Sequence, residues 1–320
     1  MRLAITVLAA LVPVVLASAG CGTRSDRPPA AQGDQPAAGA EQPLIVTNFY
    51  PVQWLAQELV GDQASVISLT PEGTEPHDLA LDAKDRKEID KADVVLYLGG
   101  DFQPDVQRAV EQLGAGAVAE DLLTAPGVEL LNAGDIGKET LAGGKDPHVW
   151  LSPVEMIAMA DAAAGTIETA LPQLAPMVES NLVRLRASLE GLDAQYRKEL
   201  TNCDTRVLVT SHAAFGYLTD AYGLQQAPIA GFNPEDEPDP KTLQSIAEVA
   251  RQDNVKTVFF EDALPSDLSQ TVADEIGAQV SLLSALEFDP RGSIGPDEDY
   301  LSVMEGNLDR IAKGLGCRGS

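Results

Sequence analysis

The sequence is poor in basic residues. It has 22 lysines and arginines against 49 aspartates and glutamates, which gives a formal net charge of −27. Nucleic acids and anionic lipid surfaces are polyanions, and a body with this charge repels them. The charge therefore argues against either as a partner of the folded chain. An acidic surface fits a protein that handles cations, but such surfaces are common and do not identify a ligand.

Cysteine is scarce as well, with three residues, Cys21, Cys203 and Cys317. Cys21 belongs to the N-terminal signal discussed below, so an even pair remains. An even pair in an oxidising compartment indicates one disulfide, between Cys203 and Cys317. Closing a loop of this length stabilises a fold by roughly 4 to 5 kcal/mol in the chain-entropy model. Two unpaired buried thiols are the alternative.

A long uncharged apolar run, Leu3 to Gly20, ends in small residues directly before Cys21. Its length is marginal for a membrane-spanning helix, Pro13 interrupts it, and no positive flank follows closely. We therefore interpret residues 1–20 as a cleaved secretory signal peptide.

The segment LASAGC, which ends at Cys21, resembles a bacterial lipobox, although Ser18 stands where leucine is expected. The cysteine of a lipobox is acylated and becomes the new N-terminus. We accordingly expect an extracytoplasmic protein anchored to the bacterial cell membrane by a lipidated Cys21. Secretion without lipid is the alternative.

The segment 21–42 contains no aromatic residue after Cys21 and no aliphatic residue larger than alanine. Such a composition cannot bury enough apolar surface to offset the entropy lost on ordering. We expect a flexible, lipid-anchored tether that holds a folded body near the membrane without inserting it.

Strand and helix patterns alternate in the first half of the folded part. Residues 44–48 and 93–99 are short, nearly continuous apolar runs, the pattern of strands buried on both faces of a parallel sheet. Helical patterns follow each of them, at 52–60 and 102–113. The alternation predicts βαβ units and an N-terminal α/β lobe over 43–172.

The same alternation returns after residue 203, and a length of 320 residues also suggests two domains. It predicts a second α/β lobe over 202–320. The expected strands are 206–211, 257–260 and 279–283, and the expected helices are 214–222, 240–252 and 266–276.

A long helix over 173–201 is predicted to join the two lobes. Pro172 and Pro176 stand at its start, where proline is tolerated. A packed helix makes a stiff connection, so small rocking is expected rather than large hinge closure. Its apolar stripe at helical spacing consists of Leu182, Leu185, Leu189, Leu192, Tyr196 and Leu200.

Histidine occurs three times, each time in a short turn-rich or aromatic-flanked motif: EPHD at His77, DPHVW at His148 and SHAAFGY at His212. Three neutral imidazoles are the commonest nitrogen donor set for zinc. A single histidine, taken alone, is more often a surface or partly buried hydrogen-bonded residue. The three are too far apart for one helix, so the fold must assemble any shared site.

The expected order of strands and loops indicates where such a site would lie. His212 follows directly on an expected strand, and His77 lies in the loop after the strand SVISL at 65–69. Ligands of open α/β sheets bind beyond the carboxyl ends of the strands. With His77 and His148 in the first lobe and His212 in the second, the site falls in the cleft between the lobes.

The chain from Leu44 to Cys317 resembles the solute-binding lipoproteins of metal-uptake ABC transporters, in the high-affinity zinc-binding branch of the cluster A-I, TroA-like family. The motifs that carry the resemblance are the following segments: EPHDLALDAKDRKEIDKADVVLYLGG, DPHVWLSP, TSHAAFGYL with YGL, GFNPEDEPDPKTL and DYLSVMEGNL.

The resemblance implies an α/β fold of two lobes, each a small parallel sheet flanked by helices, joined by one long helix with the metal between them. It also implies a binding protein, not an enzyme, that captures Zn²⁺ and delivers it to a membrane permease. We expect a monomer. A histidine at the third ligand position, here His212, favours zinc over manganese, because manganese prefers oxygen donors.

The fourth metal position is not evident from the sequence. The family commonly places an aspartate there, and Ser284 occupies the corresponding place in SLLSALEFDP. A neutral hydroxyl is a poor zinc ligand beside a carboxylate. We expect Glu261, Glu287, Asp289 or water instead. The histidine-rich loop of many zinc importers is also missing from the stretch before His148.

Asp78 and Asp146 flank ligand histidines and are candidates to orient an imidazole, with solvated loop acids as the alternative. The competing function is an enzyme with a three-histidine zinc and a metal-activated water. The sequence contains no HExxH and no other compact catalytic signature to favour it. An adhesin is a third possible function, but no motif in the sequence indicates it.

Overall fold

The computed structural model describes residues 42–100, 102–114, 117–132, 145–235, 238–262 and 266–319. The expected signal peptide and all of the tether up to residue 41, with Cys21, lie outside these ranges. Within them, no helix combines the length and apolar character needed to cross a membrane.

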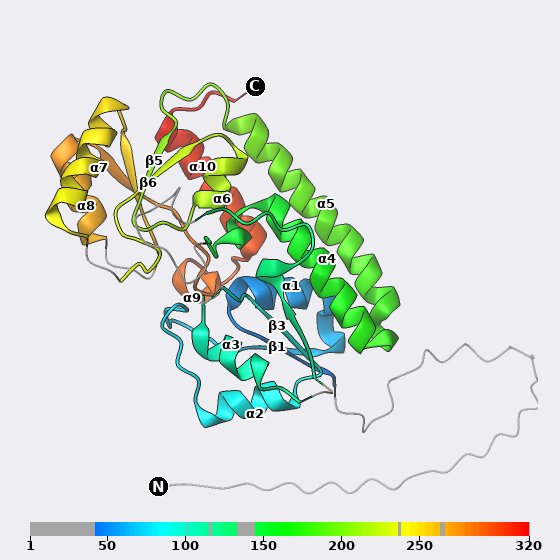
Figure 1. Cartoon of the computed structure of the whole chain (residues 1–320). Coiled ribbons are helices and arrows are strands. Elements are labelled where there is room, and N and C mark those ends of the chain that lie inside the picture. The colour runs from blue at the N-terminus through cyan, green and yellow to red at the C-terminus, as the bar shows by residue number, and fades with distance from the viewer. Residues whose placement is uncertain are drawn as a thin grey trace, which may run out of the picture. The chain divides into compact units, whose positions relative to one another are not determined.

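The first lobe is built on a parallel sheet with the strand order β2-β1-β3-β4. Its central strands are buried and apolar, so neither face can be left to water. Helices therefore cover both faces (Figure 1). The strands are β1 (Leu44–Thr47), β2 (Ser65–Ser68), β3 (Val94–Tyr97) and β4 (Val118–Asp121), and the helices are α1 (Tyr50–Val60), α2 (Ala83–Lys91), α3 (Pro104–Glu111) and α4 (Pro153–Ala170).

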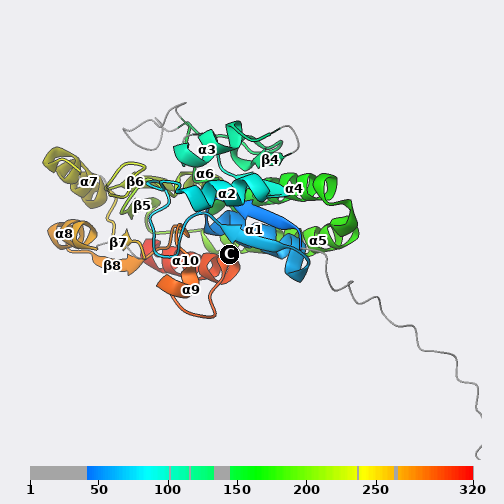
Figure 2. The ribbon, with the colours of Figure 1, turned by 90° about the horizontal axis from the view of Figure 1, so that it is seen from below.

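The second lobe repeats the arrangement, with four parallel strands in the order β6-β5-β7-β8. Figure 2 shows α7 and α8 on one side of this sheet and α10 on the other. The strands are β5 (Val207–Thr210), β6 (Gln225–Pro228), β7 (Thr257–Phe260) and β8 (Gln279–Leu282), and the helices are α6 (Gly216–Ala221), α7 (Pro240–Gln252), α8 (Asp267–Ile276), α9 (Pro290–Ser293) and α10 (Tyr300–Leu315). Short 3₁₀ helices complete the set: η1 (Gly61–Gln63), η2 (Leu122–Thr124), η4 (Val149–Leu151) and η5 (Pro172–Leu174).

Helix α5 (Ala175–Glu199) connects the lobes, with Pro176 in its first turn. It packs on α1 and α4 of the first lobe and on α10 of the second, as Figure 1 shows. Leu185, Leu189 and Tyr196 lie on its buried side. The apolar stripe predicted from the sequence is thus the side of α5 that packs against both lobes.

The hydrophobic core is continuous between the lobes. One cluster of buried side chains includes Phe49 after β1, Trp150 in η4, Leu189 in α5 and Tyr300 in α10. Two further clusters lie on the other faces of the sheets, under α2 and α3 in the first lobe and under α7 and α8 in the second. Burial of a common core makes a wide opening between the lobes costly.

The expected fold class is confirmed, with two small parallel sheets, flanking helices and one long helix between the lobes. The strand at 257–260 and the helix at 240–252 have the bounds that their patterns predict. Other elements begin or end one or two residues from their predicted bounds. Strands β4 and β6, at the sheet edges, have mixed polar sequences that we did not identify as strands.

Candidate metal centre

The structure brings the three histidines together with one glutamate. One side-chain donor atom each from His77, His148, His212 and Glu287 lies within 4.8 Å of the other three. His148 and His212 are fully buried, and the side chain of His77 is 6% exposed. Residues distant in the sequence therefore form one enclosed group of nitrogen and oxygen donors.

Glu287 lies close to all three imidazoles. Its Oε1 lies 3.3 Å from Nε2 of His77, 3.4 Å from Nε2 of His148 and 3.3 Å from Nε2 of His212. Ligands at about 2.0 to 2.1 Å from a tetrahedral zinc are separated from one another by roughly 3.3 to 3.5 Å. The three separations therefore match the edges of a tetrahedral zinc site.

Several of these donor atoms make no hydrogen bond. Nε2 of His148, Nε2 of His212 and Oε2 of Glu287 are buried and have no hydrogen-bond partner among the described residues. Buried polar atoms are almost always paired, because an unpaired one loses its hydration without compensation. Lone pairs that converge in this way suit a cation.

The fold places each donor at the same edge of its sheet or beside it. His77 follows β2, His212 follows β5 and Glu287 follows β8, all beyond the carboxyl ends of parallel strands. His148 is the residue before η4, which leads into α4. The first lobe thus supplies two histidines, and the second supplies one histidine and the glutamate.

Asp146 holds the imidazole of His148. Its Oδ1 lies 2.7 Å from Nδ1 of His148 and accepts a hydrogen bond from the backbone N–H of the same residue at 2.9 Å. Both side chains are fully buried. A carboxylate on Nδ1 leaves Nε2 as the free donor and turns it toward the other ligands. This is the arrangement expected of an acid that orients a ligand.

Glu261 plays the same part for His212. Its Oε1 lies 2.7 Å from Nδ1 of His212 and also accepts a hydrogen bond from Oγ of Ser211. Glu261 is a sequence-based candidate for the fourth ligand, but its carboxylate contacts Nδ1 of His212, on the side of the imidazole away from Nε2. It can orient His212 and add negative charge to the centre.

The remaining acids lie apart from the histidines. Asp289 caps α9 and pairs with the guanidinium of Arg291. Asp78, a candidate to orient His77, is exposed, and its backbone N–H donates to Glu75. Of the three carboxylates considered for the fourth position, the structure brings Glu287 to the Nε2 atoms.

Ser284 shapes the turn that presents Glu287. Its Oγ accepts a hydrogen bond from the backbone N–H of Leu286 at 3.1 Å, and its backbone N–H and C=O both bond to the side chain of Asn307 in α10. Leu286 has a φ of 57°, in the left-handed region that costs a residue with a side chain roughly 1 to 2 kcal/mol. The turn around Ser284 holds this conformation and so fixes Glu287.

The charges of the site shift the pKa values of its members. Burial lowers the pKa of His77, whereas for His212 the negative charges of Glu261 and Glu287 outweigh burial and raise the pKa well above its usual value. Burial lowers the pKa of His148, but the charge of Asp146 and the hydrogen bonds to Asp146 and Glu287 together outweigh burial and raise the pKa. For Glu287, burial raises the pKa, but the histidines outweigh it and hold the pKa well below the usual value. The centre therefore favours positive charge on its nitrogens, from protons or from a metal ion.

Three aromatic side chains make hydrogen bonds to backbone carbonyls and join the lobes. Nε1 of Trp150 donates to the carbonyl of Ala285 at 2.7 Å, and the hydroxyl of Tyr300 donates to the carbonyl of Trp150 at 2.6 Å. The hydroxyl of Tyr217 donates to the carbonyl of Asp146 at 2.9 Å. Sequence patterns did not identify these residues, because their roles depend on contacts between segments far apart in the chain.

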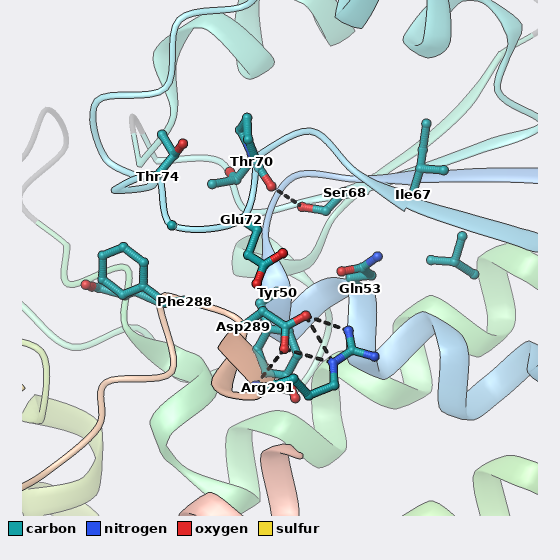
Figure 3. Close-up of a pocket in the computed structure, with 14 residues that line it drawn as sticks. Tyr50, Gln53, Ile67, Ser68, Thr70, Glu72, Thr74, Phe288, Asp289 and Arg291 are labelled. Carbon is teal, nitrogen blue, oxygen red and sulfur yellow. Dashed lines mark hydrogen bonds and ion pairs between the residues drawn. The ribbon is translucent and has the colours of Figure 1, made fainter. Parts of the chain in front are cut away.

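A cavity of about 340 Å³ lies beside the centre, between the segment 66–74 of the first lobe and the segment 287–291 of the second. Glu287 is one of its lining residues. Figure 3 shows the ion pair of Asp289 and Arg291 on one wall and Thr70 with Ser68 on the other. The cavity thus lies between the two lobes, next to Glu287, whose side chain is buried.

Cys203 and Cys317 are joined in the structure by a disulfide. Cys203 precedes β5 and Cys317 follows α10. The backbone N–H of Asp204 donates to the carbonyl of Leu315, so the two segments are also hydrogen-bonded. The bond links the end of the last helix to the start of the second sheet.

The sequence is similar to known zinc-binding proteins. Residues 45–314 match the family described as zinc-uptake complex component A, periplasmic. The chain is 32% identical over 278 residues to the high-affinity zinc uptake system protein ZnuA of Bacillus subtilis, covering 85% of this chain and 87% of that protein. It is 33% identical over 270 residues to the zinc-binding lipoprotein AdcA of Streptococcus pneumoniae, covering 82% of this chain but 54% of AdcA. The match therefore spans about half the length of AdcA.

Solved structures give the same result. The metal-dependent lipoprotein YcdH from Bacillus subtilis superposes with a TM-score of 0.72 at 32% identity, covering 86% of this chain and all of that one. The Zn(II)-bound ZnuA-like domain of Streptococcus pneumoniae AdcA gives a TM-score of 0.73 at 30% identity, with 86% of this chain and 99% of the domain covered. The chain belongs to the family of the periplasmic component A of zinc-uptake complexes.

Proposed function

We propose that the chain is the extracytoplasmic zinc-binding component of an ABC importer, which captures Zn²⁺ between its lobes and delivers it to a membrane permease. The observation that carries the proposal is the convergence of three Nε2 atoms and one carboxylate oxygen on a single buried point. The relatives that match most of the chain are described as zinc-uptake or zinc-binding proteins, which supports the same ion.

The donor set favours zinc among the common divalent ions. Three imidazole nitrogens and one carboxylate oxygen suit a tetrahedral zinc ion, whereas manganese and magnesium prefer more oxygen donors. The buried acids Asp146 and Glu261 supply further negative charge and fix the rings of His148 and His212. The site is thus adapted to hold a dication away from water.

A zinc enzyme fits the geometry less well. Catalytic zinc sites keep a position open for a water molecule that attacks the substrate. Here Glu287 occupies the place that such a water would need, since its Oε1 lies within 3.4 Å of all three Nε2 atoms. The donors are nearly inaccessible to a substrate, with exposed side-chain fractions between 0% and 6%. Ion binding without catalysis is the function that this arrangement supports.

We further propose that the protein acts as a monomer and is anchored through a lipidated Cys21. The tether after Cys21 would keep the folded body within reach of the permease. Relatives named as lipoproteins support the anchor. The acyl group can be detected by mass spectrometry of the N-terminal peptide, and replacement of Cys21 by alanine should release the protein from the membrane fraction.

Titration with zinc tests the proposed function. Wild-type protein should take up one Zn²⁺ per chain, and each of the variants His77→Ala, His148→Ala and His212→Ala should bind zinc at least tenfold more weakly with the fold intact. Competition with a chromophoric chelator gives the affinity, and circular dichroism gives the fold. Unchanged affinity in all three variants would exclude this centre as the zinc site.

A further inference from the structure

Two glutamines, one in each lobe, make the same pair of contacts beside a ligand histidine. Nε2 of Gln103, before α3, donates to Oγ1 of Thr70 and to the carbonyl of Pro76, both at 2.9 Å. Nε2 of Gln226, in β6, donates to Oγ1 of Thr210 at 2.8 Å and to the carbonyl of His212 at 2.9 Å. Each glutamine thus links a threonine near a strand end to the backbone at a histidine.

The threonines fix the direction of these bonds. The hydroxyl of Thr70 donates to the carbonyl of Asn48 at 2.7 Å, and the hydroxyl of Thr210 donates to the carbonyl of His212 at 2.7 Å. A hydroxyl can donate only one hydrogen bond, and each threonine already donates it to a backbone carbonyl, so the threonine oxygen can only accept a hydrogen bond from the glutamine. The amide N–H groups must therefore point at the histidine segment.

Neither glutamine is explained by stability alone. Oε1 of Gln103 and Oε1 of Gln226 are buried and have no hydrogen-bond partner among the described residues. An unpaired buried carbonyl destabilises a fold, and an apolar side chain of similar volume would avoid this. What a methionine at either position could not supply is the pair of N–H donors.

The histidines need this support to different degrees. Nδ1 of His148 and Nδ1 of His212 each contact a buried carboxylate. His77 has no such carboxylate among the described residues, and it lies in the segment between β2 and α2, which forms neither helix nor strand. Its ring packs edge-on against Phe102, 4.6 Å between centroids. The next residue, Gln103, holds the backbone, so two consecutive residues position His77.

We propose that Gln103 and Gln226 are positioning residues for zinc capture, each of which fixes the backbone at a ligand histidine so that its Nε2 is in place before the ion arrives. The inference rests on the proposed zinc-binding function. A preformed donor set loses less conformational entropy on binding and therefore binds more tightly. Because each lobe carries its own Gln–Thr pair, the two histidine segments are fixed independently of each other.

The variants Gln103→Met and Gln226→Met test the proposal, because methionine keeps the size of the side chain and removes the donors. Each should weaken zinc binding about tenfold, the lower end of the effect of removing groups that orient metal ligands. The exposed glutamines Gln112, directly after α3, and Gln225, in β6, provide matched controls, and their methionine variants should bind zinc as wild type does.

Double variants separate positioning from a general structural effect. If Gln103 acts through His77, then Gln103→Met should change affinity less than twofold when His77 is already alanine. The same holds for Gln226→Met when His212 is alanine. Chelator competition gives the affinities, and thermal unfolding of the metal-free variants gives the stability. Where a methionine variant fails to fold, Thr70→Val or Thr210→Val removes the glutamine's partner instead.

The outcomes are distinct. Loss of affinity in the single variants that disappears in the double variants supports the proposal. A lower melting temperature with unchanged zinc affinity, or an equal loss of affinity with and without the histidine, would overturn it. If His77→Ala and His212→Ala themselves leave zinc binding unchanged, the proposed function fails, whatever the glutamine variants show.

Discussion

The residues of the candidate metal centre have two roles: some present donor atoms, and others hold those donors in position. His77, His148, His212 and Glu287 present donor atoms to one point, while Asp146 and Glu261 contact the far side of two imidazoles. A ligand and an orienting acid can share a residue type, as Glu287 and Glu261 do. The atom that each one contacts, Nε2 or Nδ1, distinguishes them.

That distinction predicts different zinc release from the two glutamate variants. Glu287→Ala removes a proposed ligand, so zinc should pass to a chelator at least tenfold faster than from wild type. Glu261→Gln keeps a group on Nδ1 of His212 but removes its charge, and it should accelerate release less. Asp289→Ala is the matched control, since Asp289 pairs with Arg291 and should not affect release. Stopped-flow mixing with a chelator measures the rates, and equal rates for Glu287→Ala and wild type would leave water as the fourth ligand.

Zinc affinity should fall as the pH is lowered, because protons and zinc compete for the same imidazole lone pairs. Histidine in a peptide has a pKa near 6.5. The pKa of His212 is raised well above its usual value by Glu261 and Glu287, which outweigh burial, so competition should begin above pH 6.5. Affinity should therefore be highest at alkaline pH and should already be declining before the pH falls to 6.5. Chelator competition across this range measures it, and a constant affinity would contradict the assignment of imidazole ligands.

At the scale of helices and strands, buried apolar runs and amphipathic stripes were predictable, and the polar edge strands β4 and β6 were not. Strand β7 and helix α7 are evident in the sequence because their patterns reflect burial directly. Strand β6, QQAP, is polar and ends in Pro228, and it is a strand because it pairs with β5 at the sheet edge. Its pairing partner, not its own residues, determines its structure.

The candidate site was predictable to a similar degree. The three histidines stood out because histidine is rare in this chain and each lies in an ordered motif. Glu287 was one of several acids in the sequence that could have been the fourth ligand. The turn at Leu286, with its left-handed backbone, places Glu287 beside the histidines, and this turn is not evident from the sequence. Gln103 and Gln226 carry no recognisable motif, since their function depends on contacts with distant segments.

The disulfide joins two neighbouring elements of the second lobe, since Cys203 precedes β5 and Cys317 follows α10. In protein from an oxidising host, Cys203 and Cys317 should resist alkylation until a reductant is added, which intact-mass measurement will show. Cys203→Ser should lower the free energy of unfolding by up to roughly 4 to 5 kcal/mol, because the unfolded chain regains the entropy of an open loop. Zinc affinity should change little, as the bond lies outside the donor group. Two alkylated thiols in folded, unreduced protein would contradict the pairing.

Across the two lobes, one shared core and several buried hydrogen bonds limit relative motion. Trp150 of the first lobe bonds to Ala285 of the second, and Tyr300 of α10 bonds back to Trp150. Helix α5 packs on helices of both lobes. Opening the site by separating the lobes would break these contacts, so local rearrangement of the segments around the donors is the less costly way to admit or release an ion.

We propose that one zinc ion binds between the lobes to His77, His148, His212 and Glu287. A crystal structure of the zinc-loaded protein, with anomalous diffraction recorded on both sides of the zinc absorption edge, tests it most directly. We expect one strong peak per chain, about 2.0 to 2.2 Å from the three Nε2 atoms and from a carboxylate oxygen of Glu287. A peak elsewhere, or a peak whose ligands do not include these three histidines, would contradict it.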